Sequence, residues 1–182
     1  MADESQFVEV IKQAKESDKD RKFKQSVEMI MVFRDVDVKK GFAISETVQL
    51  PKKTTTPASV CIMASGDMGV KAKNAKADMV MDESELTKLS ADKKKAKKLI
   101  NDYDFFLADT KLMPAVGKKL GQLLGPRGKM PTPVPFNAPI ESFLERFRSS
   151  VKIKAKGSLS MSCKIGEENM DDADLAANAN AV

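Results

Sequence analysis

The sequence contains no histidine and no tryptophan among its 182 residues, and it has one tyrosine and two cysteines. Histidine is the most frequent acid–base catalyst and the most frequent zinc ligand in proteins. Its absence disfavours many classes of enzyme, although carboxylate or lysine chemistry stays open. We therefore expect a protein that is not an enzyme and that uses no metal or other cofactor.

Long apolar runs and paired cysteines are also missing. No run approaches the roughly 20 apolar residues of a membrane span, and the polar start MADESQ lacks the features of a secretory signal. Cys61 and Cys163 lie far apart without metal-ligand spacing, which predicts buried free thiols. We expect a cytoplasmic protein with no membrane partner.

The net charge is +5, from 31 basic and 26 acidic side chains. Five of the carboxylates stand in the stretch EENMDDAD, residues 167–174, so the remainder carries 31 basic against 21 acidic groups, a net charge of +10. A basic body of this kind favours polyanionic partners such as nucleic acid or an acidic membrane.

The chain ends are predicted to be helix and strand. Helical spacing predicts a first helix that ends near Ser17. Alternation of apolar residues then predicts two strands, at 27–34 and 44–50, which we expect to pair as an antiparallel hairpin. A second hairpin is predicted at 150–165, with its turn at Gly157.

The middle of the chain has a different pattern. After the extended stretch PKKTTTP (51–57), short apolar runs such as ASVCIMA and YDFFLAD alternate with helical segments, which predicts a parallel sheet covered by helices. Residues 125–139 contain seven glycines and prolines, so we expect a shaped loop there.

These patterns predict an α/β protein of two domains. Residues 1–54 and 150–182 would form one discontinuous α+β domain from both chain ends, and residues 55–149 an inserted three-layer α/β domain. The two connections between the domains would act as a double hinge.

Two segments of the discontinuous domain combine features of RNA sites. In RKFKQS, Phe23 stands between Lys22 and Lys24 and is followed by Gln25 and Ser26. An aromatic ring with cations and hydrogen-bonding groups can stack on a base and bind phosphate; the alternative is that Phe23 packs in the core. In KIKAKGS, lysines 152, 154 and 156 share one face of a strand, which is also the pattern of any half-exposed strand.

Two other basic segments admit plainer explanations. The turn GDMG (66–69), with lysines 71 and 73 after it, lacks the spacing of a dinucleotide site or a P-loop, which favours a helix-capping turn. It is nevertheless the support for an alternative function, a nucleotide- or phosphate-dependent enzyme that uses the α/β domain. The lysines of KKKAKK (93–98) fit a solvated helix face, and a general RNA-binding protein is a third interpretation.

The helix through Leu112, Val116, Leu120 and Leu123 runs into LGPRGKMPTP. This arrangement resembles the signature of large-subunit ribosomal protein one, the L-one family, in its archaeal form. DRKFKQSVEMIMVFRDV, MASGDMGVKAKNAKAD and the segment from GSLSMSCKIG to LAANANAV also resemble this family, so that the resemblance covers essentially the whole chain.

The resemblance implies a discontinuous RNA-binding domain and an inserted Rossmann-like domain without a nucleotide. It further implies a protein that is monomeric when free and a structural constituent of the large ribosomal subunit. Such a protein binds the rRNA of the mobile stalk, assists release of deacylated tRNA from the exit site, and represses translation by binding its own mRNA. The family continues into a last strand and a Thr-Met-Gly loop that contacts rRNA, whereas this sequence stops at Val182 within a helical run.

Carried over by position, the resemblance assigns RNA contacts to two groups of residues in the discontinuous domain. They are Lys22, Phe23, Gln25 and Ser26, and Lys154, Lys156, Gly157 and Ser158. Four basic residues of the inserted domain are expected to make secondary contacts with tRNA or rRNA: Lys118, Lys119, Arg127 and Lys129.

Overall fold

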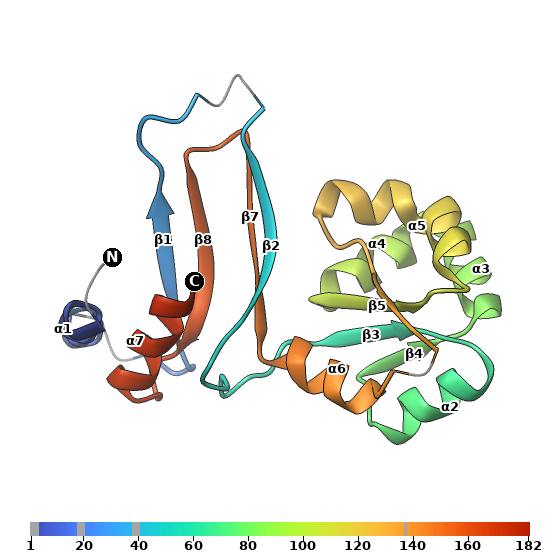
Figure 1. Cartoon of the computed structure of the whole chain (residues 1–182), viewed down its shortest axis with the longest axis horizontal. Coiled ribbons are helices and arrows are strands. Elements are labelled where there is room, and N and C mark those ends of the chain that lie inside the picture. The colour runs from blue at the N-terminus through green and yellow to red at the C-terminus, as the bar shows by residue number, and fades with distance from the viewer. Residues whose placement is uncertain (1–3, 18–20, 38–40, 137) are drawn as a thin grey trace. The chain divides into compact units, whose positions relative to one another are not determined.

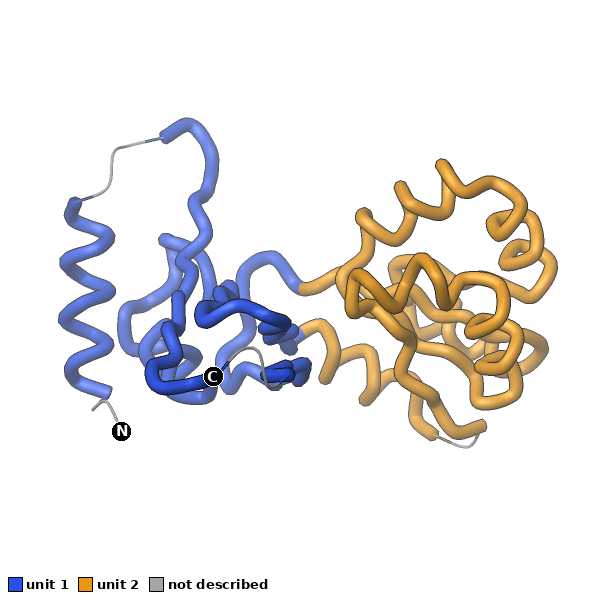
Figure 2. The backbone as a smooth tube through the Cα atoms, turned by 90° about the horizontal axis from the view of Figure 1, so that it is seen from above, with its two compact units in different colours: residues 1–57, 149–182 blue, residues 58–148 orange. Residues whose placement is uncertain are grey.

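The computed structural model describes residues 4–17, 21–37, 41–136 and 138–182, and it divides the chain into two compact units (Figure 1). Unit 1 contains residues 1–57 and 149–182, and unit 2 contains residues 58–148 (Figure 2). Both chain ends therefore build unit 1, whereas unit 2 is one continuous insertion. In the described part of the chain, no helix is long and apolar enough to cross a membrane.

Unit 2 is a three-layer α/β structure. Its four parallel strands lie in the order β4-β3-β5-β6. The strands are β3 (Val60–Met63), β4 (Met79–Met81), β5 (Phe105–Asp109) and β6 (Thr132–Val134). The helices are α2 (Gly66–Asn74), α3 (Glu83–Ala91), α4 (Lys93–Asp102), α5 (Met113–Arg127) and α6 (Ile140–Arg148).

The central strands of unit 2 are apolar on both faces because helices cover both. Cys61 and Met63 of β3 pack in one cluster with α3, α4 and α5, while Val60 and Ile62 pack in the other with α2 and α6. All four of these side chains are fully buried. The predicted α/β fold class, with an inserted three-layer domain, is confirmed.

The prediction that residues 125–139 form a loop is wrong in part. Helix α5 continues through Gly125 and Pro126 and ends at Gly128, which has the left-handed φ of +69°. Pro126 stands inside the helix although it has no N–H to donate to the preceding turn, and Pro133 is tolerated because β6 is an edge strand. The number of glycines and prolines therefore predicted a loop where the chain forms the end of a helix and a short edge strand.

Helix α3 was not predicted, although its first turn carries a readable signal. The Asp82 carboxylate accepts a hydrogen bond from the Glu85 N–H at 2.7 Å, and the Glu85 carboxylate accepts one from the Asp82 N–H at 3.1 Å. This reciprocal pair is a capping box. The pattern D-x-x-E at the head of a helical segment would have indicated it.

The described residues of unit 1 form four strands and two helices. The strands are β1 (Ser26–Val32), β2 (Ala43–Gln49), β7 (Ser150–Lys156) and β8 (Ser160–Glu167), and the helices are α1 (Glu4–Glu16) and α7 (Asp172–Ala181). Strand β1 pairs with β8 and β2 pairs with β7, both antiparallel, and β7 lies beside β8 (Figure 1).

Both predicted hairpins are therefore wrong, although all four strands exist. The connection between β1 and β2, residues 33–42, is much longer than the two to five residues of a tight hairpin. Each strand from the N-terminal side forms its hydrogen-bonded ladder with a strand from the C-terminal side instead. Alternation identifies a strand, but it does not identify the partner.

One face of these strands packs on the two helices. Its core cluster joins Ile153, Cys163 and Ile165 of the strands to Ile11 of α1 and Leu175 of α7. Alternate residues of β1, namely Val27, Met29 and Met31, pack against the same cluster. Cys61 and Cys163 are buried free thiols, as predicted.

The stretch 51–57 is fixed to unit 1 by two buried polar side chains. The Glu167 carboxylate accepts hydrogen bonds from the N–H groups of Thr55 at 2.8 Å and Thr56 at 3.1 Å, and it pairs with Lys164 at 2.6 Å. Asn178 accepts from the Lys52 N–H at 2.9 Å and donates to the Lys52 carbonyl at 3.1 Å. These contacts satisfy backbone groups of a stretch that has no ladder of its own.

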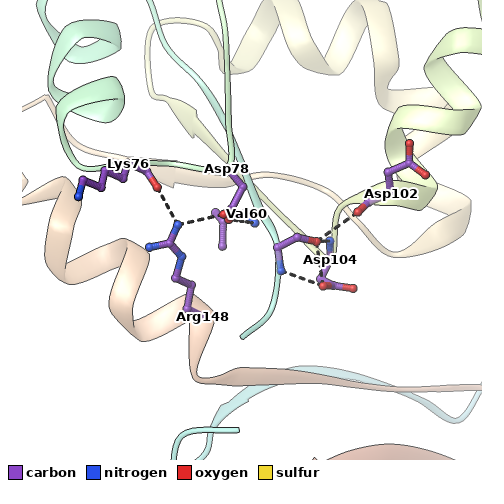
Figure 3. A network of polar contacts seen from close by, with 7 residues as sticks. Val60, Lys76, Asp78, Asp102, Asp104 and Arg148 are labelled. Carbon is purple, nitrogen blue, oxygen red and sulfur yellow. Dashed lines mark hydrogen bonds and ion pairs between the residues drawn. The ribbon is translucent and has the colours of Figure 1, made fainter. Parts of the chain in front are cut away.

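The two ends of unit 2 are held next to each other. The Ala58 N–H donates to the Arg148 carbonyl at 3.1 Å. The Arg148 guanidinium donates to the Lys76 carbonyl at 2.7 Å and to the Asp78 carboxylate at 3.0 Å, and Asp78 accepts from the Val60 N–H at 2.9 Å (Figure 3). The start of β3 and the end of α6 are thus joined by one polar network.

Glu167→Gln should lower the free energy of unfolding at pH 7 by about 1–3 kcal/mol, because it removes a buried, hydrogen-bonded charge. Burial opposes ionisation of Glu167, but the hydrogen bonds from Lys164, Thr55 and Thr56 outweigh it and lower the pKa of this carboxyl below its usual 4.5. A lowered folded-state pKa gives stability that is present above pH 4.5 and is lost as the pH falls further.

Urea unfolding at pH 7 and pH 3 measures this effect. The difference between the parent chain and Glu167→Gln should shrink at pH 3, and Glu168→Gln serves as the neighbouring isosteric control. An equal difference at both pH values would show that Glu167 does not act through its charge.

Gly166→Ala should destabilise unit 1 by about 1–3 kcal/mol through overpacking. A Cβ on Gly166 would lie 2.4 Å from Leu175 Cδ2 and 2.7 Å from Met170 Sδ. Gly121→Ala is the matched control, because a Cβ there meets no atom within 4 Å. Thermal unfolding of both variants checks this, and equal melting temperatures for the two would contradict it.

Candidate nucleic-acid interface

The strands of unit 1 turn their other face away from α1 and α7. We call this surface the open face. It contains the alternate positions of all four strands that the core does not use: Ser26, Glu28, Ile30, Val32, Ala43, Ser45, Thr47, Lys152, Lys154, Lys156, Ser160, Ser162 and Lys164. Cations and hydroxyl groups dominate it, which suits phosphate oxygens and ribose hydroxyls.

Two aliphatic side chains on the open face are unusually accessible. Ile30 is 70% exposed and Val32 is 67% exposed. In the ladder Ile30 stands opposite Ser162, and Val32 stands opposite Ser160. The open face is therefore polar with an apolar stripe along β1.

The segment before β1 presents an aromatic ring to solvent. Phe23 is 63% exposed, and the Arg21 guanidinium carbon lies 5.9 Å from the centre of its ring. Lys22 and Lys24 on either side are also exposed. The alternative that Phe23 packs in the core is therefore wrong, and the ring is available for stacking.

The backbone next to Phe23 is anchored. The Gln25 carbonyl accepts a hydrogen bond from the Glu168 N–H at 3.0 Å, and Ser26 stands opposite Glu167 in the ladder. These contacts fix the point where the segment enters β1. An aromatic side chain on an anchored segment loses less conformational freedom on binding than one on a loose chain.

The second predicted group lies around the β7–β8 turn. Lys154 stands opposite Ser45 and Lys156 opposite Ala43. Gly157 has a φ of +67°, which favours glycine, and Ser158 donates its hydroxyl to the Ser160 carbonyl at 3.0 Å. The lysines are exposed, whereas the Ser158 hydroxyl already shapes the turn.

The structure does not bring the two predicted groups together. The ladder begins at Ser26 opposite Glu167 and ends at Val32 opposite Ser160, so the groups occupy opposite ends of β1 and β8. A strand of this length spans about 20 Å at 3.3 Å per residue. The proposed contacts can serve one RNA only if that RNA runs along the open face.

Lys164 and Ser162, which the sequence interpretation did not select, lie between the two ends. Both belong to the alternating run of β8, and their alternation with buried Cys163 and Ile165 was the signal that could have identified them. Lys164 pairs with Glu167 at 2.6 Å. A phosphate at this place would share Lys164 with that carboxylate.

Like charges are close together on β7. Burial, and secondarily the charge of Lys154, lower the pKa of Lys152. A pKa lowered partly by a neighbouring cation indicates repulsion that an anion would relieve.

The acidic stretch 167–174 has a structural role. Three of its five carboxylates form ion pairs: Glu167 with Lys164, Asp172 with Lys15 at 2.6 Å, and Asp174 with Lys52 at 2.8 Å. It therefore helps to hold α7, α1 and the stretch 51–57 in unit 1.

The four basic residues of unit 2 that are predicted to make secondary RNA contacts lie on or just after α5. Three of them already make contacts within the protein. Lys119 donates to the Thr87 hydroxyl at 2.7 Å, and Arg127 donates to the Asn101 side chain at 3.2 Å. Lys129 donates to the carbonyls of Ile100 at 2.9 Å and Tyr103 at 2.6 Å, and burial lowers its pKa.

Lys118 is exposed on α5. Lys119, Arg127 and Lys129 join α5 and the chain after it to α3 and α4, so a nucleic acid would have to compete with these contacts. Their role as secondary RNA contacts stays a prediction.

Features of a catalytic centre are weak. Among the described residues, no group of three histidine, cysteine or acidic side chains could hold a metal ion. Burial, with a smaller contribution from Glu85, raises the pKa of Cys61 to about 12, so this thiol is a poor nucleophile. Residues 66–69 form the first turn of helix α2 itself, and the N-cap position before it is Ser65.

Comparison with known proteins identifies the family. Residues 11–182 match the family model described as "Ribosomal protein L1p/L10e family". Three archaeal relatives, each named "Large ribosomal subunit protein uL1", show the degree of similarity. The relative from Cenarchaeum symbiosum is 69% identical over 182 residues, covering 100% of this chain and 84% of that protein.

The relative from Thermofilum pendens is 51% identical over 177 residues, covering 96% of this chain and 79% of that protein. The relative from Archaeoglobus fulgidus is 42% identical over 180 residues, covering 98% of this chain and 84% of that protein. The resemblance seen around LGPRGKMPTP, including its archaeal character, is confirmed. The chain therefore belongs to the ribosomal protein L1p/L10e family.

Proposed function

We propose that the chain is a non-catalytic constituent of the large ribosomal subunit and binds the rRNA of the stalk through unit 1. Membership of the family and the names of its archaeal relatives support the first part. The observation that carries the second part is Phe23, exposed beside Arg21 on an anchored segment that leads into the open face.

Each part of this surface would make a different contact. Phe23 would stack on an unpaired base, and Lys22 would neutralise a phosphate beside it, with Gln25 and Ser26 next to them. Lys154 and Lys156 would bind the RNA backbone at the other end of the open face, with Gly157 and Ser158 shaping the turn. Because these groups lie about 20 Å apart, RNA that fills both ends has to be structured and not a single nucleotide.

The same surface supports a regulatory role. We propose that the chain also binds its own mRNA and thereby represses translation, as the family resemblance implies. One interface cannot hold two RNAs at once, so rRNA and mRNA would compete, and repression would begin when rRNA sites are filled. Assistance to the release of deacylated tRNA from the exit site is proposed on the same resemblance.

Phe23→Ala should weaken binding to a stalk rRNA fragment about tenfold, because base–aromatic stacking contributes about 1–3 kcal/mol. It should leave the salt dependence unchanged, since no charge is lost. The matched control is the double variant Lys94→Gln, Lys98→Gln on α4, where both lysines are exposed. This control should weaken binding less and should make the salt dependence shallower if either lysine contacts phosphate.

Filter binding at two salt concentrations, with unrelated RNA as competitor, measures the affinity for the stalk fragment and its salt dependence. A larger loss from the α4 double variant than from Phe23→Ala would remove Phe23 from the interface. Equal affinity for the stalk fragment and unrelated RNA would favour a general RNA-binding protein.

A further inference from the structure

Unit 2 carries a second exposed aromatic side chain with cations beside it. Phe136, which follows β6, is 46% exposed. The Lys111 ammonium lies 5.1 Å from the centre of its ring, and the Lys71 ammonium lies 5.9 Å from it. The interface on unit 1 uses none of these three residues, and the sequence interpretation named only Lys71, in connection with the GDMG turn.

The three residues come from separate segments that meet at one edge of the sheet. Phe136 follows β6, Lys111 follows β5, and Lys71 is on α2, which follows β3. These strands are parallel, so their carboxyl ends share an edge. The chain runs from β3 to β4 on one side and then to β5 on the other, and such a reversal of strand order is where open α/β sheets bind ligands.

A surface hollow lies beside Lys71. It has a volume of about 420 Å³ and is lined by Lys71, Asn74, Ala138, Pro139, Ile140 and Glu141. This volume falls within the range of about 300–1,000 Å³ typical of small-ligand sites. The Asn74 amide and the Glu141 carboxylate supply hydrogen-bonding groups of the kind that meet a base edge, while the proline and aliphatic side chains supply apolar surface.

We propose that Phe136, Lys71 and Lys111 form a second RNA contact, which takes a nucleotide of a single strand. The base stacks on the exposed part of the Phe136 ring or enters the hollow next to Lys71. The two ammonium groups neutralise the phosphates on either side of that base. Stacking of this kind accepts every base, because each has a π face.

Two features favour a polynucleotide over a free nucleoside phosphate. The turn after β3, GDMG, lacks the glycine and lysine spacing that cradles a di- or triphosphate. The two cations instead lie near one aromatic ring, and cations next to a stacking ring suit the bases and phosphates of a polynucleotide. The lysine run on α4 offers charge as well, but the structure shows no ring beside it among the described residues.

Nuclear magnetic resonance titration of the full chain with a uridine nonamer at low salt tests this proposal. The backbone amides of Phe136, Lys71 and Lys111 should shift and saturate together. Phe136→Ala should weaken this binding about tenfold, and the double variant Lys71→Gln, Lys111→Gln should weaken it at least as much. The double variant Lys94→Gln, Lys98→Gln on α4, which packs on the opposite face of the sheet from α2, is the charge-matched control and should change it less than twofold.

The proposal is overturned if these three amides do not shift, or if the α4 double variant weakens binding as much as Lys71→Gln, Lys111→Gln does. Uridine monophosphate titrated to the same concentration should bind far more weakly, and equal affinity would indicate a mononucleotide site and overturn the RNA assignment. The amide of Phe23 reports on unit 1 in the same spectra. Shifts at Phe136 without shifts at Phe23 would support this contact independently of the interface on unit 1, for which we propose a structured RNA.

Discussion

Unit 1 depends on pairing strands that are more than 100 residues apart in the sequence. Strand β1 must find β8 and β2 must find β7, with all of unit 2 inserted between β2 and β7. Closing a long flexible loop costs entropy before any contact forms. A folded insertion whose ends are adjacent removes most of that cost, because it replaces a long loop by a short link. The hydrogen bond from Ala58 to Arg148, with the Arg148–Asp78 ion pair beside it, provides such a link.

In unit 1, Glu167 and Asn178 hold the stretch 51–57, which leads into unit 2. They bind backbone groups of the stretch 51–57, and both come from the C-terminal part of the chain. Glu167 also stands opposite Ser26, at the end of the ladder where Phe23 emerges. A change at Glu167 therefore affects the stretch 51–57 and the anchoring of the segment that we propose to bind RNA, so any loss of RNA affinity in such a variant has to be judged together with its stability.

The sequence was sufficient for properties that local patterns determine. Buried strands such as β3 and β5, and the α/β class, follow from short apolar runs between helical segments. Strand partners do not, because alternation in β1 is equally compatible with β2 or β8. Residues 125–139 contain the end of a helix and a short strand because Pro126 and Pro133 lie at positions where these elements accept them. Amino-acid composition does not give those positions. For the candidate site, the sequence selected the exposed Phe23 but could not place it in relation to Lys156, because their separation depends on a ladder between distant segments.

Hydrogen–deuterium exchange of the chain, with and without a stalk rRNA fragment, measures whether unit 1 binds this RNA through the Phe23 segment and the open face, as we propose. Amides of residues 21–25 and 157–159 lie outside the strand ladders, so added protection there can be attributed to RNA. Exchange should slow in both segments when RNA is bound. Slowed exchange confined to unit 2, with residues 21–25 unchanged, would contradict this proposal.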